Sequence, residues 1–252
     1  MVWAAVSRAI RTPSALDASM QFDIGGFITP EGLPVIFRLQ GNPRIENENL
    51  TAYEVGYRTQ WRDRLTLDIA AYYNSYDHLL TTETTTPFME TSPPPLHTVQ
   101  ALLTENLMAA ETQGAEVSAN WKITDRWSLS PRYAFEQVHA RLDRSSHDVP
   151  SLENVEGVTP AHWARIDSLV RISRDLLWNT DLTFVDRLTL GNVPSYNRLD
   201  TQLTWHFSEK AALTLAGQNL LRDHHLEIVD PATGWPSSLV KRSGSVKFTW
   251  WF

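Results

Sequence analysis

The sequence predicts an all-β protein, an antiparallel up-and-down transmembrane β-barrel segment of about ten strands. Three observations support this fold class: apolar and polar side chains alternate with a two-residue period, the alternating stretches are unusually long, and short connections alternate with long ones. This pattern predicts short turns on the periplasmic side of a membrane and long loops on the extracellular side. We expect residues 1–252 to form one domain.

The composition excludes several other classes of protein. The chain has 22 Lys and Arg against 29 Asp and Glu, a formal net charge of −7, which argues against a nucleic-acid binder. It has no cysteine, so it has neither a thiol nucleophile nor a cysteine-ligated zinc. No apolar run approaches the roughly 20 residues of a transmembrane helix. Met1–Leu16 lack the pattern of a signal peptide, because Arg8 and Arg11 interrupt a short apolar run.

The alternation is clearest from Leu65 to Tyr73, where every second residue is apolar. Stretches of this kind are about ten to fourteen residues long, which suits a tilted membrane-spanning strand of about 9–11 residues better than the five or six typical of soluble domains. Leu33–Leu39 is a candidate for a further short strand. The ten predicted strands are Val2–Ile10, Ala52–Gln60, Leu65–Tyr76, Glu105–Ile123, Trp127–Arg141, His162–Ile172, Leu177–Leu190, Tyr196–Phe207, Ala211–Leu221 and Val240–Phe252.

The connections between these strands are of two kinds, as in outer-membrane barrels. The short polar turns are Arg62-Asp63-Arg64, Thr124-Asp125-Arg126, Ser173-Arg174-Asp175 and Ser208-Glu209-Lys210. The long irregular segments are Ala18–Asn49, Thr81–Thr104, Leu142–Ala161 and Asp223–Ser238.

Tryptophan is abundant, with ten residues in the chain, and most of it lies near the short turns or the C-terminus. Tryptophan prefers the boundary between membrane and water, where its ring is apolar and its N–H stays hydrated. We therefore expect an aromatic girdle at the periplasmic rim. Its members are Trp61, Trp121, Trp127, Trp178, Trp205, Trp250 and Trp251.

Five short motifs occur in an order that resembles the TonB-dependent outer-membrane receptors. Gly217-Gln218-Asn219-Leu220-Leu221, followed by Asp223, is similar to the family's Asn-Leu-Phe-Asp turn, although Leu221 replaces Phe and Arg222 intervenes. The chain ends on Phe252, like the terminal aromatic that the barrel-assembly machinery recognises. The other motifs are Ser7-Arg8-Ala9-Ile10-Arg11-Thr12-Pro13-Ser14, Gly41-Asn42-Pro43 with Tyr53-Glu54-Val55-Gly56-Tyr57-Arg58, and Gly114-Ala115-Glu116-Val117.

The resemblance implies the C-terminal part of a barrel of about 22 strands, without the family's plug domain and TonB-contacting box. It further implies energised uptake of a scarce, bulky solute across the bacterial outer membrane, most often an iron–siderophore complex or cobalamin. The implied partners are the lipid bilayer, the barrel-assembly machinery, a small-molecule ligand and, in a full-length parent, the TonB complex. No cofactor is implied.

Charged residues on the polar side of the strands are expected to face the barrel interior, since a lipid-facing charge is unfavourable. Most such residues simply pair with one another or with water, but some are candidates for substrate contact. The strand His162–Ile172 alternates less cleanly, with Ile166, Val170 and Ile172 outward and Trp163 inward. The candidates for substrate contact are Arg58, Glu116, Arg132, Arg165 and Arg171, together with His224 and His225 on a long loop; Asp68, Glu136 and Asp167 share the inner side.

An enzymatic alternative comes from the histidine and acid residues on the loops. His147-Asp148 and His224-His225, with Asp223 and Asp230, are residue types used in acid–base catalysis or metal binding. A small autonomous barrel, either an omptin-like protease or a passive pore, would also fit ten strands. However, no serine-elbow, His-Glu-x-x-His or phosphate-loop pattern is present, so we expect no catalytic residues and no metal site.

The C-terminal strand is predicted to carry an assembly signal rather than a transport function. Val246, Phe248, Trp250 and Phe252 form an apolar row spaced by two at the end of the chain. The first and last strands are expected to leave the sheet open, because the twist of a wide barrel is set by more than ten strands.

Overall fold

The computed structural model describes residues 1–229 and 238–252 and contains one large sheet of 13 strands, with a separate two-stranded hairpin. Ten strands of the large sheet follow one another in chain order, each antiparallel to its neighbours, which confirms the predicted up-and-down arrangement. They are β1 (Val2–Arg11), β4 (Glu48–Trp61), β5 (Leu65–Thr84), β7 (His97–Thr124), β8 (Trp127–Leu142), β9 (His162–Arg171), β10 (Leu176–Val185), β11 (Tyr196–Ser208), β12 (Ala211–Gln218) and β15 (Ser243–Trp250).

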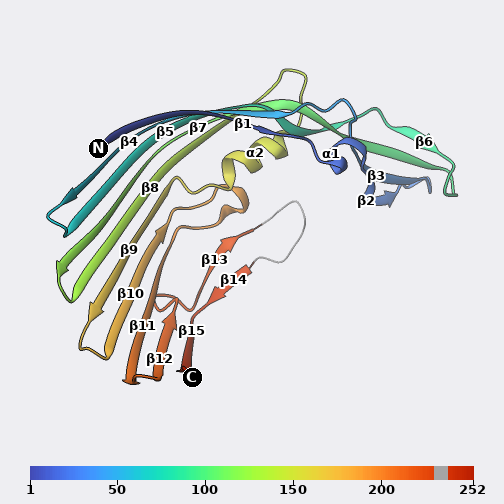
Figure 1. Cartoon of the computed structure of the whole chain (residues 1–252). Helices are drawn as coiled ribbons and strands as arrows, with labels where there is room; N and C mark the ends of the chain where they lie inside the picture. The colour runs from blue at the N-terminus through green and yellow to red at the C-terminus, as the bar shows by residue number, and fades with distance from the viewer. Residues whose placement is uncertain (230–237) are drawn as a thin grey trace.

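The sheet is strongly curved, with α2 (Val149–Gly157) and the hairpin of β13 (His224–Ile228) and β14 (Ser238–Lys241) on its concave side (Figure 1). The sheet does not close on itself. Among the described residues β1 pairs only with β4 and β15 pairs only with β12, so the predicted open form is confirmed.

The predicted long loops contain more regular structure than expected. β2 (Gln21–Ile28) pairs with β3 (Pro34–Gln40), which covers the predicted short strand and lies parallel to the first residues of β7. β5 and β7 both continue into the segment predicted as the loop Thr81–Thr104, and β6 (Phe88–Glu90) pairs with β7 there. Because these extensions pair with each other, their backbone groups remain hydrogen-bonded beyond the expected strand ends.

Short helices also occur between the strands: α1 (Ala15–Ser19), α2 and the 3₁₀ turn η1 (Leu190–Asn192). The predicted strand Leu177–Leu190 was too long at its end, because β10 ends at Val185 and η1 begins at Leu190. Asp148 is the N-cap of α2: it accepts a hydrogen bond from the Ser151 N–H and another from the Thr82 N–H. This buried aspartate therefore has a structural role. α2 packs by Leu152 and Val155 against a small core of Met108, Ala110 and Ala140 on the inner face. No helix among the described residues has the length and apolarity needed to span a membrane.

The two faces of the sheet differ in character as the alternation predicts. The ladder aligns Tyr53 with Tyr73 and Val55 with Ala71 on the outer face. On β9, Ile166 is exposed outward whereas Trp163 lines the inner face, as expected, but Ile172 lies beyond the end of the strand. Other exposed outer side chains near the short turns are Trp61, Trp121, Trp127, Trp178, Trp205 and Trp250.

The C-terminal strand is shorter than predicted. β15 begins at Ser243, because Ser238–Lys241 pair with β13 instead, and it ends at Trp250. Phe252 is fully exposed beyond the strand, so it does not continue the ladder row of Val246, Phe248 and Trp250.

Candidate functional site

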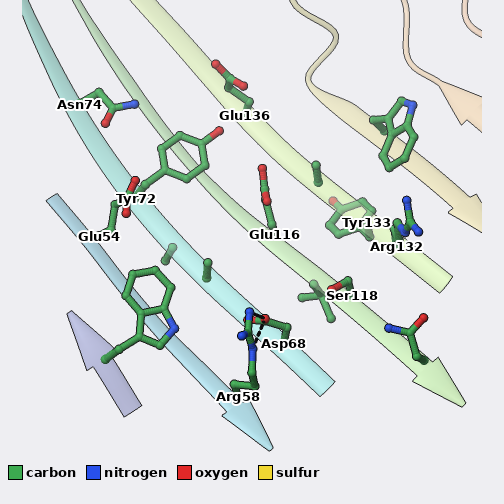
Figure 2. A pocket seen from close by; sticks show the side chains of 17 residues that line it. Glu54, Arg58, Asp68, Tyr72, Asn74, Glu116, Ser118, Arg132, Tyr133 and Glu136 are labelled. Carbon is green, nitrogen blue, oxygen red and sulfur yellow. Dashed lines mark hydrogen bonds and ion pairs between the residues drawn. The ribbon is translucent and has the colours of Figure 1, made fainter. Parts of the chain in front are cut away.

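The main hollow of the concave face lies over β4, β5, β7 and β8 and has a volume of ≈ 890 Å³ (Figure 2). We call it the inner-wall pocket. Its side chains come from strands distant in sequence, because the ladder aligns Arg58 with Asp68, Asp68 with Ser118, and Ser118 with Arg132. The charged residues that line it are Glu54, Arg58, Asp68, Glu116, Arg132 and Glu136, and Trp3 and Trp163 lie at its margins.

Four acids and two arginines line this pocket, and only one pair of them is joined. Arg58 Nε donates a hydrogen bond to Asp68 Oδ2 at 2.6 Å. Within the described part of the chain, Glu54, Glu116, Arg132 and Glu136 form no ion pair. Charged groups that lack a protein partner are available to a polar ligand or to another protein segment in the lumen.

A second polar cluster lies further along the inner face, on β9, β10 and β11. Arg165 pairs with Asp181 on the neighbouring strand and with Asp167 on its own. Arg198 binds Asp200 at 2.8 Å and lies 3.6 Å from Glu227 of β13. These pairs join the barrel wall to the inward-folded hairpin.

His225 is the centre of the contact between that hairpin and the wall. It is buried, with Nδ1 3.1 Å from Asn219 Oδ1 and Nε2 3.0 Å from Glu227 Oε1. Its ring stacks on Tyr196 at a centroid distance of 4.1 Å. Asn219 is fully buried: its Nδ2 donates to the Val240 carbonyl and its backbone N–H donates to Asp200. The motif around Asn219 therefore anchors the hairpin.

The structure brings only some of the predicted candidates together. Arg58, Glu116 and Arg132 share the inner-wall pocket, and Arg165 belongs to the second cluster. Arg171 lies at the end of β9, where its backbone N–H donates to the Arg126 carbonyl. His225 is an anchor, whereas His224 is exposed and pairs along the hairpin with Lys241.

Sequence reasoning overlooked several inner-face residues, among them Glu54, Asp181 and Arg198. Each occupies the polar side of its strand, so the two-residue period could have identified them. Asp230 lies outside the described residues. Within residues 1–229 and 238–252, no three histidine or acidic side chains are grouped so that they could hold a metal ion.

The sequence of the chain matches one known protein family over most of its length. Residues 1–220 match the family model described as TonB dependent receptor-like, beta-barrel. The chain belongs to this family. Among functionally characterised proteins, no sequence matches this chain.

Solved structures of similar fold are receptors and transporters. The siderophore receptor PirA of Acinetobacter baumannii matches with a TM-score of 0.66 and 15% identity, over 88% of this chain and 35% of PirA. The ferric-catecholate import receptor Fiu of E. coli K12 gives 0.69 and 13%, over 98% and 32%. A mutant of the ferric enterobactin receptor PfeA of Pseudomonas aeruginosa gives 0.71 and 15%, over 99% and 38%.

Because these identities are low, the similarity establishes only the fold of this chain. The chain spans roughly a third of the length of these structures. The copper transporter OprC has the same fold, with a TM-score of 0.64 and 14% identity, over 99% of this chain and 36% of OprC.

Proposed function

We propose that this chain is the C-terminal part of the wall of an outer-membrane receptor that takes up an iron–siderophore complex. The observation that carries the proposal is a family-matched curved sheet whose outer face is apolar and whose inner face holds unpaired charges over a hollow of ≈ 890 Å³. A lipid-facing outside and a polar inside are the requirements of a membrane-spanning transport wall. As a single domain, residues 1–252 supply part of the substrate path.

The inner-wall pocket suits a bulky polar solute. Arg132 supplies a cation without an acidic partner among the described residues, and Glu116 supplies a hydrogen-bond acceptor on the adjacent strand. Trp3 and Trp163 add aromatic surface at the margins. Names of structural neighbours such as PirA and Fiu favour an iron–siderophore complex, while cobalamin is the alternative cargo of the same class.

Energy for transport is proposed to come from the TonB complex in a full-length parent. The barrel-assembly machinery is proposed to act on the C-terminal end, where Val246, Phe248 and Trp250 form an exposed outer row and Phe252 is free beyond it. We place the protein in the bacterial outer membrane. Membership of a receptor family argues against the omptin-like protease alternative.

Ligand binding tests the substrate class. The chain is refolded in detergent, and ferric siderophores of the catecholate and hydroxamate types, as well as cobalamin, are titrated against tryptophan fluorescence. We expect a ferric siderophore to quench the fluorescence of Trp3 and Trp163, and Arg132→Gln to weaken binding by about ten- to a hundredfold, since loss of one charge-assisted contact costs roughly 1.5–3 kcal/mol.

Matched variants separate the outcomes. Arg174→Gln, at a periplasmic turn outside the pocket, should leave binding unchanged, and Trp163→Phe should reduce the quenching amplitude. If cobalamin quenched the fluorescence and neither siderophore did, the proposed substrate would be cobalamin and not an iron–siderophore complex. Identical affinity in the Arg132→Gln and Arg174→Gln variants would contradict a role for the inner-wall pocket.

A further inference from the structure

One row of cross-strand partners forms the floor of the inner-wall pocket. Each member lies directly opposite the next on the adjacent strand, so all of them face the inner side of the sheet. The two ends of the row are tryptophans, one glutamate lies between them, and the other members are small. In order from β1 to β9, the row consists of Trp3, Gly56, Ala70, Glu116, Ala134 and Trp163.

The small members of this row leave space for the aromatic rings and for a ligand. Trp3 lies across Gly56, where a Cβ would clash with the indole ring. Glu116 is exposed and lies in the middle of the pocket (Figure 2). Five strand spacings of about 4.8 Å separate Trp3 from Trp163, which makes the floor roughly 24 Å wide. The pocket therefore offers a central carboxylate with an indole ring on each side.

The charges around this row are mostly negative. Glu54 and Glu136 lie in the next row on one side of Glu116, and Arg132 lies in the next row on the other side. In total, four carboxylates and two guanidinium groups line the pocket, which gives a formal charge of −2. One guanidinium is paired with one carboxylate, so three carboxylates and one arginine remain without an ion pair in the described part of the chain.

This charge balance discriminates between the two common kinds of ferric siderophore. A ferric tris-catecholate is a trianion, and the three carboxylates would repel it. A ferric tris-hydroxamate is neutral at the metal centre and avoids this repulsion. A protonated amine on such a ligand can in addition donate a charge-assisted hydrogen bond to Glu116. The indole rings of Trp3 and Trp163 also attract a cation and pack against the methylene chain that carries it.

Arg132 complements Glu116 in binding such a ligand. The direct partner of Glu116 is Ala134 and that of Arg132 is Ser118, so the two charged residues are diagonal neighbours, about 7–8 Å apart along the ladder. We propose that the inner-wall pocket selects a ferric hydroxamate siderophore that carries a protonated amine. Glu116 accepts the hydrogen bond from the ammonium group, and Arg132 donates to the hydroxamate oxygens. The inference rests on the proposed function and narrows its substrate class.

A matched pair of ligands tests the role of charge. Ferrioxamine B is a ferric tris-hydroxamate with a free ammonium group, and its N-acetylated form has the same iron centre without that charge. Both are loaded with radioactive iron, together with ferric enterobactin as the trianionic catecholate, and equilibrium dialysis measures their binding to the chain refolded in detergent. We expect ferrioxamine B to bind about tenfold more tightly than its acetylated form, and ferric enterobactin to bind most weakly.

Glu116→Gln keeps the size of the side chain and removes its charge. This variant should bind ferrioxamine B and its acetylated form with equal affinity. Glu209→Gln, at an exposed turn outside the pocket, should keep the preference of the unsubstituted chain. Because both affinities are measured on the same variant, their ratio does not depend on the fraction of protein that is folded.

The possible results separate this inference from the proposed function. Equal affinities of the two hydroxamates in the unsubstituted chain, or a preference that persists in Glu116→Gln, overturn the role of Glu116. Tighter binding of ferric enterobactin than of ferrioxamine B overturns the selection by charge and leaves uptake of an iron–siderophore complex intact. If none of the three ferric siderophores binds, the proposed function fails together with the inference.

Discussion

Gly114 lies under the side chain of Tyr72 on the neighbouring strand, and this close approach explains why glycine occupies the position. A Cβ at Gly114 would clash with the Tyr72 hydroxyl and lie 2.5 Å from the Phe135 carbonyl oxygen. We expect Gly114→Ala to lower the free energy of unfolding by about 1–3 kcal/mol through overpacking. Gly244→Ala is the matched control, since the nearest atom to its Cβ is 3.7 Å away. Urea titration followed by tryptophan fluorescence in detergent measures both, and equal midpoints would contradict the packing argument.

Asn219 supplies the second residue-scale prediction. Truncation to alanine removes the donor to the Val240 carbonyl and the acceptor for His225, and leaves the buried His225 ring without its Nδ1 partner. An unsatisfied buried group costs about 1–3 kcal/mol. Asn219→Ala should therefore speed amide exchange in β13 and β14 by about one order of magnitude or more, as measured by hydrogen–deuterium exchange. Asn197→Ala, at an exposed site on β11, is the control. Unchanged exchange in the hairpin would show that Asn219 is not its anchor.

At the scale of elements, the strands β2, β3 and β6 are joined by one arginine. Arg38 binds Asp23 at 2.6 Å and Glu90 at 2.8 Å, and Glu90 Oε2 also lies 3.5 Å from His97 Nε2. The hydrogen bond from Arg38 holds the pKa of Glu90 below its ordinary value. Because the folded-state pKa is the lower one, the stabilisation is complete above the unfolded pKa of about 4.3 and is lost as the pH falls through the folded value.

Docking of β6 should therefore weaken in acid. Limited proteolysis of the Phe88–Glu90 segment should be slow at pH 7. It should be several-fold faster below about pH 4, because the Glu90 carboxylate becomes protonated below its ordinary pKa of about 4.3. Arg38→Met should give fast cleavage at both values, while Arg64→Met, which removes an exposed pair with Asp125 at a short turn, should resemble the unsubstituted chain. A rate independent of pH would contradict the role of Glu90.

For the whole molecule, the apolar outer face determines whether the protein is soluble in water or needs detergent or lipid. Large apolar side chains such as Val246, Phe248 and Trp250 are more than half exposed, and they form a continuous band with the other outer residues. A band of this kind in water drives association. Without detergent or lipid the chain should aggregate, which light scattering measures. A monodisperse, detergent-free monomer with β-type circular dichroism would contradict a membrane-spanning wall.

The last residue provides a separate test of assembly. Deletion of Phe252 should lower the amount of protein in the outer membrane and leave ligand affinity per folded molecule unchanged, because Phe252 is remote from the inner-wall pocket. Phe252→Tyr, which keeps a terminal aromatic, should restore the amount. Quantitative immunoblotting of membrane fractions makes the comparison. Normal abundance after deletion would remove the sorting role.

Much of the ten-strand path follows from the sequence, because a two-residue alternation is a local property and hydrocarbon accepts only one of the two faces. Leu65–Tyr76 and Trp127–Arg141 illustrate this, since both predicted stretches lie inside observed strands. The same alternation places Arg58, Glu116 and Arg132 on the inner side, and the ladder then brings them into one pocket.

Tertiary structure alone decided what the long segments do. The parallel pairing of β3 with β7, and the removal of Ser238–Lys241 from the last strand into a hairpin, depend on partners far apart in sequence. The same holds for the stacking of His225 on Tyr196, which lies 29 residues earlier in the chain. Strand alternation identifies faces, but it does not specify which edge a loop will meet, because that choice depends on the combined shape and hydrogen-bonding capacity of the folded wall.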